Sequence, residues 1–316
     1  MGQNKLKTNK QIMKNNNLSK INLKLETIYK LHNDWIKSIS LFPSGKIISV
    51  SSDKSINIYN TNFTIFQKIN EAHEKNIINL SIKDENNFAT CSFNDIKTWI
   101  KKDNKYILNK NISNAHEKWI NKIIFFQNGN LISCSRDNTV KIWEENIKNY
   151  QLITTIQNLK YIMSILFLNH FNLLLTCGFE GTKIWNLFDF GKYINFKYYF
   201  NEVICSCWNG IDIFDNDKII IGGNKYLFII SILDMKIIKK IDILFRCNGI
   251  KVFYNKGFLL FGGWSYDIII YNCYNLKIIN KIENAHNGFI NGFINLNNNL
   301  IGSFSADNNL KIWSFK

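Results

Sequence analysis

The chain has 316 residues, 46% of them hydrophobic, and a formal net charge of +15. The apolar fraction is sufficient for a large core, and no run of about 18 uncharged apolar residues indicates a membrane span. The basic residues are nearly all lysines spread along the chain, and arginine occurs only at Arg136 and Arg246. We interpret the charge as a compositional bias, with a surface for nucleic acid or anionic membrane as the alternative.

Residues 1–20 contain five lysines and no acidic residue, and we expect them to form a flexible basic tail. This segment lacks the apolar stretch of a secretory signal, which predicts an intracellular, cytoplasmic protein with the nucleus as the alternative. Gly2 follows Met1 as in N-myristoylated proteins, but Leu6 occupies the position where that motif has Ser or Thr. An unmodified tail is therefore the preferred interpretation.

From Leu23 onward, short apolar runs with alternating polar residues are separated by Asn, Asp, Gly and Lys. The first four are LKLETIY, SISLF, KIISVSS and SINIYN, all between residues 23 and 60. Runs of this kind at intervals of about ten residues predict an all-β chain of antiparallel strands.

A set of four side chains recurs at fixed offsets. His116 is followed by Ser133, Asp137 and Trp143 at steps of 17, 4 and 6 residues. The same steps separate two further sets, which are His32, Ser49, Asp53 and Tyr59, and His286, Ser303, Asp307 and Trp313. Three matches within one chain indicate an internal repeat.

The last residue of each repeat recurs every 40 to 45 residues, a length that suits four short strands and their turns. These residues are Tyr59, Trp99, Trp143, Trp185, Ile230, Tyr271 and Trp313. The spacing and the histidine-to-tryptophan pattern resemble those of WD-repeat β-propellers, also called WD40 or G-protein β-subunit-like repeats. The resemblance covers about residues 22–316. It implies one domain, residues 21–316, folded as a seven-bladed β-propeller of four-stranded antiparallel blades.

The same resemblance predicts how the ring closes. In WD-repeat proteins each repeat supplies the outer strand of one blade and the three inner strands of the next. The strand predicted at residues 23–29 would then complete the seventh blade and remove an open sheet edge.

In WD-repeat proteins the recurring side chains form a structural hydrogen-bond network, or tetrad, and the resemblance assigns this role to the three sets above. The second unit keeps His73, Thr90 and Trp99, with Asn94 or Asp95 in the aspartate position. The fourth unit keeps Thr176, Glu180 and Trp185 without a histidine, and the fifth and sixth have lost the set. A hydrolase triad is the alternative for His, Ser and Asp. Three copies, each with an aromatic residue, favour the structural role.

No sequence motif points to catalysis. The seven cysteines include no CxxC pair, and no HExxH, GxxxxGK[ST], GxGxxG or GxSxG motif occurs. Outside the tetrads the remaining histidine is His170. We therefore predict no catalytic residues, cofactor, metal or small-molecule substrate. An enzyme with a site at the channel mouth is the alternative.

The resemblance also predicts a binding face. In the family, the third residue after the histidine and the residue before the turn aspartate point toward one end of the propeller. The candidates of binding type at these positions are Trp35, Phe93, Trp119, Arg136, Phe179, Trp264 and Phe289. Trp, Phe and Arg dominate binding hot spots, although aromatic residues here would alternatively cap the core between blades. We predict a protein-binding scaffold or adaptor that acts as a subunit of a multi-protein complex.

Two variants within the family are disfavoured. Phosphoinositide-binding propellers carry an FRRG loop, whereas this chain has Arg246 followed by Cys247. Propellers that serve as substrate receptors of cullin ubiquitin ligases often contain Trp-Asp-x-Arg, which is absent here.

Overall fold

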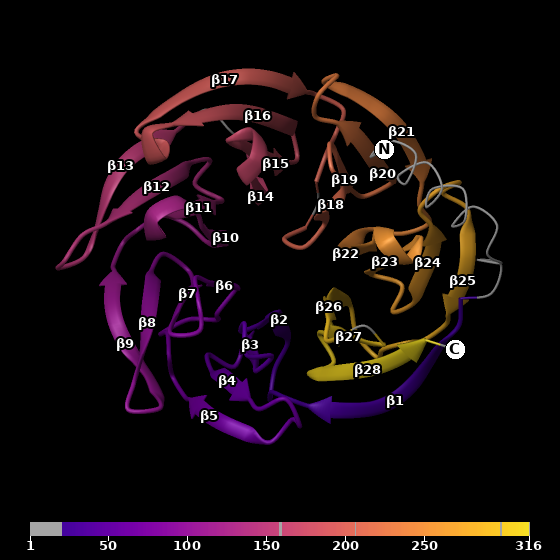
Figure 1. Ribbon diagram of the computed structural model, residues 1–316, viewed down its shortest axis with the longest axis horizontal. Helices are drawn as coiled ribbons and strands as arrows, with labels where there is room; N and C mark the ends of the chain where they lie inside the picture. The colour runs from indigo at the N-terminus through magenta and orange to yellow at the C-terminus, as the bar shows by residue number, and fades with distance from the viewer. Residues whose placement is uncertain (1–20, 158–159, 206, 298, 316) are drawn as a thin grey trace, which may run out of the picture.

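The computed structural model describes residues 21–157, 160–205, 207–297 and 299–315. The predicted basic tail, residues 1–20, lies outside them. The described chain forms seven four-stranded antiparallel sheets, arranged as blades around a central channel (Figure 1). This arrangement confirms the all-β, seven-bladed propeller predicted from the sequence.

Within each blade the strands follow one another from the channel outward. Blades 1 and 2 contain β2 (Ile36–Leu41), β3 (Ile47–Ser51), β4 (Ile56–Tyr59), β5 (Ile65–Ile69), β6 (Asn79–Ile82), β7 (Asn87–Cys91), β8 (Ile96–Lys102) and β9 (Lys105–Ile112). Blades 3 and 4 contain β10 (Ile120–Phe125), β11 (Leu131–Ser135), β12 (Val140–Glu145), β13 (Tyr150–Ile156), β14 (Ile162–Leu168), β15 (Leu173–Gly178), β16 (Gly181–Phe188) and β17 (Tyr193–Phe200).

Blades 5 and 6 contain β18 (Ile211–Asp215), β19 (Lys218–Gly222), β20 (Tyr226–Ser231), β21 (Lys236–Asp242), β22 (Cys247–Phe253), β23 (Phe258–Gly263), β24 (Ile268–Asn272) and β25 (Ile278–Ile282). Blade 7 contains β26 (Ile290–Asn295), β27 (Leu300–Ser305), β28 (Asn309–Phe315) and β1 (Leu23–Lys30). Short 3₁₀ turns occupy four hairpin connections, η2 (Gln127–Gly129), η3 (Asn169–Phe171), η4 (Asp189–Gly191) and η5 (Tyr254–Lys256). Among the described residues no helix has the length and apolar character to cross a bilayer.

The two ends of the propeller sequence meet in blade 7, as predicted. Strand β1 pairs antiparallel with β28 along its whole length, with Leu23 opposite Phe315 and Lys30 opposite Asn309. Leu23 is buried in the same core cluster as Trp313. The first strand therefore closes the ring without a covalent link.

A β-bulge at one equivalent position shows that the blades share a register. In blades 1 to 6 the pairing of the third strand with the fourth shifts immediately before the residue that ends the repeat, at Tyr59, Trp99, Trp143, Trp185, Ile230 and Tyr271. In blade 7 the shift falls beside the pairing of Leu25 with Trp313. Blades 5 and 6 lack the tetrad yet keep the bulge, which explains why their spacing survives.

The hydrophobic core lies between the blades. Each cluster joins the faces of neighbouring sheets, as where Ile48 and Val50 of blade 1 pack with Leu80 and Phe88 of blade 2. The seven cysteines are buried and free. Alternating inward and outward side chains place apolar residues on both faces of an inner strand, which accounts for the nearly continuous burial of β3 and β11.

Polar side chains around the channel bridge one blade to the next, and we call this set the channel belt. Asn79 donates to Ser38 Oγ at 3.5 Å and accepts from the Ile123 amide at 3.2 Å. Asn121 donates to the Ile162 carbonyl oxygen at 2.6 Å, and Ser164 donates to that of Trp208 at 2.9 Å. Asn209 donates to the Asn291 carbonyl oxygen and Asn291 to that of Ile36, each at 2.8 Å. Asn209 also forms a parallel β-bridge with Gly249. The belt thus runs around the channel, passing from the segment before blade 5 to blade 7 and meeting blade 6 through this backbone bridge.

Blades 6 and 7 approach each other most closely at two glycines, and this contact predicts a destabilising substitution. A Cβ at Gly249 would lie 2.5 Å from the Cα of Gly292, which is backbone and cannot rotate away. We expect Gly249→Ala to lower the free energy of unfolding by about 2 kcal/mol, because the seam must widen. Urea unfolding measures the change.

Gly302→Ala is the matched control for this seam. The atoms nearest a Cβ at Gly302 are side-chain methyl groups of Ile294 and Leu310, each at 2.8 Å, and no backbone atom is among them. A loss in Gly302→Ala equal to that in Gly249→Ala would contradict the backbone contact as the cause.

Candidate functional site

In three blades the recurring polar side chains form one unbroken chain of hydrogen bonds, from Asp through His and Ser or Thr to Trp. In blade 3, His116 Nδ1 lies 2.8 Å from Asp137 Oδ2, His116 Nε2 lies 2.7 Å from Ser133 Oγ, and the Trp143 indole donates to Ser133 Oγ at 2.8 Å. Blade 7 repeats this with His286, Asp307, Ser303 and Trp313 at 2.9, 2.7 and 2.8 Å. Blade 2 repeats it with His73, Asp95, Thr90 and Trp99 at 2.8, 2.7 and 2.9 Å. Asp95, not Asn94, accepts from the histidine there.

Blades 1 and 4 form partial versions of the network. His32 contacts Asp53 Oδ2 (3.0 Å) and Ser49 Oγ (2.8 Å), but the Tyr59 hydroxyl donates to Leu31 O at 3.0 Å and not to Ser49. A phenol carries its donor at the far end of the ring, beyond the position of an indole N–H.

In blade 4, the Trp185 indole donates to Thr176 Oγ1 at 3.0 Å. Glu180 instead forms an exposed ion pair with Lys160 at 2.8 Å.

A single proton arrangement satisfies each complete chain. A neutral His116 donates from Nδ1 to Asp137 and accepts at Nε2 from the Ser133 hydroxyl, whose oxygen accepts from Trp143. Burial lowers the pKa of His116 despite the neighbouring carboxylate. Burial alone would raise the pKa of Asp137, but the hydrogen bonds from His116 and Thr139 hold it well below its usual range. Ser133 is fully buried, so its oxygen is not presented to a substrate.

The predicted binding residues all lie at one end of the propeller, which we call the mouth face. They occupy either the connection from a fourth strand to the next blade or the turn from a second to a third strand. Antiparallel strands bring both connections to the same end. Trp35, Phe179 and Trp264 have 42%, 38% and 48% of their surface exposed. The other four, Phe93, Trp119, Arg136 and Phe289, are half-buried.

The structure gathers the aromatic residues of this face into separate groups. Trp264 stacks on Phe289 with ring centroids 4.8 Å apart, and Trp35 meets the same phenyl ring edge-on at 6.2 Å. Phe93 and Trp119 form a second, edge-on pair at 5.1 Å. Phe179 contacts Tyr161 at 5.8 Å. The first group joins blades 6, 7 and 1 and presents two indoles to solvent.

Three basic side chains accompany these aromatic rings, and we call Lys37, Arg136 and Arg246 the cation cluster. Lys37 Nζ lies 4.4 Å from the ring centre of Trp35 and 5.0 Å from that of Trp208, and the Arg246 guanidinium lies 5.1 Å from that of Trp264. Burial, together with nearby Arg136, lowers the pKa of Lys37 to about 8 although Asp34 opposes the shift.

Buried Asn121 fixes two further members of this arrangement. Its Oδ1 atom accepts from Arg136 Nε at 3.2 Å and from the Trp208 indole at 3.0 Å. Trp208 lies in the connection before β18, and its backbone oxygen accepts from Ser164. The Trp208 side chain, from the segment before blade 5, therefore contacts both Lys37 of blade 1 and Asn121 of blade 3. Sequence reasoning missed Lys37, Trp208 and Asn121. Lys37 and Asn121 each lie five residues after a repeat histidine, in the bulge of a first strand, but the family pattern assigns no role to that position.

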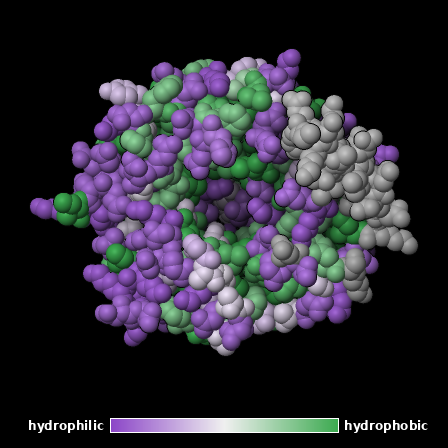
Figure 2. Space-filling model, viewed as in Figure 1, coloured by the Kyte–Doolittle hydropathy of each residue, from purple (hydrophilic) through white to green (hydrophobic). Residues whose placement is uncertain are grey.

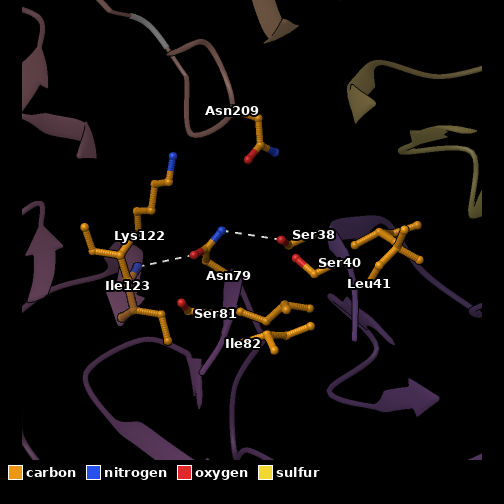
Figure 3. A pocket seen from close by; sticks show the side chains of 12 residues that line it. Ser38, Ser40, Leu41, Asn79, Ser81, Ile82, Lys122, Ile123 and Asn209 are labelled. Atoms are coloured by element: carbon orange, nitrogen blue, oxygen red, sulfur yellow. Dashed lines mark hydrogen bonds between the residues drawn. The ribbon is translucent and has the colours of Figure 1, made fainter. Parts of the chain in front are cut away.

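A cavity of about 340 Å³ lies in the channel beside β2, β6 and β10, and both polar and apolar side chains line it. Figure 3 shows Asn209 directed into it from a loop on one side, with Ser38, Ser40, Asn79 and Ser81 on the other side and Lys122 beside Ile123. Lys122 donates to Ser164 Oγ at 3.2 Å, and burial lowers its pKa. The hollow at the centre of the ring, with hydrophilic residues in its depth, is visible in Figure 2.

A larger hollow of about 1330 Å³ is lined by the turns after β14, β18 and β22, at the end opposite the mouth face. His170 lies there and is exposed. Lys218 in the same hollow is paired with Asp217 at 2.9 Å and Asp215 at 3.7 Å. In the part of the chain that the structure describes, no three His, Cys, Asp or Glu side chains are grouped as for a metal ion.

Comparison with known proteins matches this architecture. The family model described as WD domain, G-beta repeat (WD40) fits residues 23–60 and 109–144. Each matched segment runs from an outer strand through the three inner strands of the next blade.

Among curated proteins, the chain is 26% identical over 160 residues to DDB1- and CUL4-associated factor 10 of Xenopus laevis, an alignment that covers 48% of this chain and 34% of that protein. The human protein of the same name is 31% identical over 84 residues, which are 27% of this chain and 15% of that protein. The chain spans about a third or less of the length of these relatives.

Proposed function

We propose that this seven-bladed propeller, a chain with WD40 repeats, is a non-catalytic adaptor that holds partner proteins on its mouth face. The observation that carries the proposal is the pair of exposed indoles, Trp35 and Trp264, braced on Phe289 and flanked by the cation cluster. Large aromatic side chains beside arginine are the composition of interface hot spots. A rigid scaffold that presents short loops is suited to such binding.

The chemistry of the described residues supports binding over catalysis. The recurring His, Ser and Asp groups are buried and mutually satisfied, and they sit inside the blades away from any cavity described above. Lys37, Arg136 and Arg246 are among the basic groups at the mouth face, and their positive charge attracts anions. No nucleophile is paired with a general base among them.

A double substitution tests the proposal. Trp35→Ala with Trp264→Ala is expected to reduce the partner protein recovered in affinity capture by tenfold or more, because each hot-spot indole contributes about 2 kcal/mol. The melting temperature is expected to change little, since both rings are nearly half exposed. Quantitative mass spectrometry of the captured proteins is the measurement.

Tyr193→Ala is the control, because Tyr193 is 67% exposed on outer strand β17, away from the mouth face. Equal recovery from the double variant and the wild-type chain would refute the assignment of this face.

The names of the relatives suggest DDB1 and CUL4 as the first partners to test. The chain lacks the Trp-Asp-x-Arg sequence discussed above, since Trp143 is followed by Glu144 and Trp313 by Ser314. Co-purification of DDB1 with the tagged chain would support a shared assembly. Its absence from captures that contain other specific partners would separate this finer proposal from the general adaptor function.

A further inference from the structure

One position on the innermost strands carries a lysine in blade 3 and a short side chain in every other blade. Pairing with the second strand defines the position, since Lys122 pairs with Cys134 as Ser164 pairs with Cys177 in the next blade. In the order of the blades the equivalent residues are Ser38, Asn79, Lys122, Ser164, Gly210, Gly249 and Gly292. The innermost strands line the channel, so the short side chains leave space there. Lys122 is the one long side chain in this set.

The amine of Lys122 differs from that of another lysine on an innermost strand. Its Nζ atom donates to Ser164 Oγ at 3.2 Å, and no carboxylate of the described residues lies at salt-bridge distance from it. Lys251 on β22 is instead paired with Asp212 at 3.2 Å. Burial is the main cause of the lowered pKa of Lys122. A larger share of this amine is therefore uncharged than in a solvated lysine, and an uncharged amine is a nucleophile.

The channel cavity gives this amine room for a ligand. Lys122 is one of the residues that line the space of about 340 Å³. Ser40 and Asn209 line it from two sides (Figure 3). Asn209 uses its amide nitrogen to bond Asn291, and among the residues that the structure describes its side-chain oxygen and the Ser40 hydroxyl have no hydrogen-bond partner. Ligand pockets commonly have roughly 300–1,000 Å³, so this cavity suits a small, partly polar molecule.

We propose that Lys122 binds a small hydroxylated aldehyde in the channel as a reversible imine. The lone pair of the amine adds to the carbonyl carbon while the electrons of the C=O bond move to oxygen. A proton then passes from nitrogen to that oxygen, which gives a carbinolamine. As the C=N bond forms, the C–O bond breaks, and the departing hydroxide takes up the second proton lost by nitrogen. One water is released for each imine formed, and no oxidant or reductant is needed.

The surroundings of Lys122 favour an aldehyde over an anion. An anion requires the charged ammonium, and burial disfavours that form. Imine formation replaces the amine by a neutral group and so avoids the cost of a buried charge. The free hydroxyl of Ser40 and the side-chain oxygen of Asn209 provide hydrogen-bonding groups for hydroxyls of the ligand.

Reductive trapping tests the proposal on the full chain. The protein is incubated at neutral pH with D-glyceraldehyde and cyanoborohydride, which adds hydride to the C=N bond and leaves a stable secondary amine. Peptide mass spectrometry gives the labelling rate of each lysine. We expect Lys122 to be labelled at least about tenfold faster than Lys239, which is exposed on outer strand β21, because more of its amine is uncharged. Equal rates, or no label at Lys122, would overturn the proposal.

A second probe and an omission test the chemistry. Propanal has the same chain length as glyceraldehyde but no hydroxyl group. With Lys239 as the internal reference, Lys122 should prefer glyceraldehyde, and Ser40→Ala should reduce this preference. Equal labelling by both probes would refute a hydroxylated ligand. Without cyanoborohydride the label should disappear on dilution, because the imine hydrolyses, and a label that persists would refute reversible binding.

Two variants locate the site. Lys122→Met should remove the fast label while leaving the melting temperature equal or higher, since methionine fills similar space without a buried charge. Lys251→Met is the matched control, because Lys251 also lies on an innermost strand but is paired with Asp212. It should leave the label at Lys122 unchanged. A fast label that persists in Lys122→Met would place the reactive amine elsewhere and overturn the assignment.

The imine site and the adaptor function can fail separately. The double variant of Trp35 and Trp264 is expected to label Lys122 at the wild-type rate, because neither indole lines the cavity. Lys122→Met is expected to capture the same partner proteins as the wild-type chain. Loss of partners in the double variant without fast labelling of Lys122 would leave the adaptor function standing and refute the imine site.

Discussion

Deletion of residues 21–30 is expected to abolish the single cooperative unfolding transition of the propeller. These residues include β1, whose backbone pairs with β28 from Leu23 to Lys30. Loss of the strand exposes the edge of β28 and removes Leu23 from the core beside Trp313. Burial of one leucine contributes about 2 kcal/mol, and the loss of the whole ladder adds to this. The sum approaches a typical domain stability of about 5–15 kcal/mol.

Urea unfolding followed by tryptophan fluorescence and by far-UV circular dichroism measures this effect. We expect the two probes to give broad, non-coincident transitions for the deletion variant, together with aggregation through the open edge. Deletion of the predicted tail alone, residues 2–20, is the control and should leave the transition unchanged. A sharp transition at the wild-type midpoint in the 21–30 variant would contradict closure by β1.

Asp137→Ala is expected to lower the free energy of unfolding by about 3 kcal/mol. Asp137 accepts hydrogen bonds from His116 Nδ1, from the amide and hydroxyl of Thr139, and from the Glu117 amide at 2.6–3.1 Å. Its removal leaves a buried imidazole without an acceptor. A fall of roughly 2 °C in melting temperature per kcal/mol follows for a chain of this size.

Glu180→Ala is the matched control. Glu180 stands at the equivalent sequence position in blade 4, but its carboxylate pairs with Lys160 at the surface. We expect its substitution to change stability by less than about 0.5 kcal/mol. Equal effects of the two substitutions would show that the buried network contributes no more than a surface ion pair.

The same network predicts acid lability. The pKa of His116 and that of Asp137 are both lowered in the folded chain, and hydrogen bonds lower the pKa of Asp307 to about 2 although burial opposes this. A lowered pKa means that the folded state binds fewer protons than the unfolded chain. The contribution to stability is thus present above the unfolded pKa values, about 6.5 for His and 3.9 for Asp, and is lost as the pH falls. Asp137→Ala should therefore show a shallower loss of stability below pH 5 than the wild-type chain.

The blade count was predictable because it depends on a local repeat. The residues that follow the bulge, Tyr59, Trp99 and their equivalents, recur every 40 to 45 residues, so spacing alone located blades 5 and 6 after their tetrads were lost. The choice between Asn94 and Asp95 required coordinates. The turn in blade 2 has one residue fewer than the others, so spacing does not decide which of the two residues takes the aspartate position. Tyr59 was assigned to the network by position, but the longer reach of its phenol directs it to a backbone carbonyl.

The cation cluster was not predictable from spacing. Lys37, Arg136 and Arg246 belong to different blades and to different kinds of segment, and only closure of the ring brings them together. Asn121 and Trp208 are 87 residues apart and share one hydrogen bond. A sequence signal did exist, since both arginines of a lysine-rich chain lie in this cluster. That the two arginines lie near Lys37 could not be inferred from the repeat pattern, because it depends on how the ring brings different blades together.

The channel belt has a mechanical consequence. Its hydrogen bonds lie next to the channel and connect the inner strands around the ring. A force on the loops of one blade is therefore transmitted to the other blades. A closed ring has no terminus from which separation can spread. If two neighbouring blades move apart, the other hydrogen bonds of the channel belt must lengthen or the packing between the remaining blades must tighten. The channel opening at the mouth face is therefore expected to keep the same diameter whether or not a partner is bound. Selectivity among partners would then depend on the side chains at the mouth face and not on a change in the diameter of the ring.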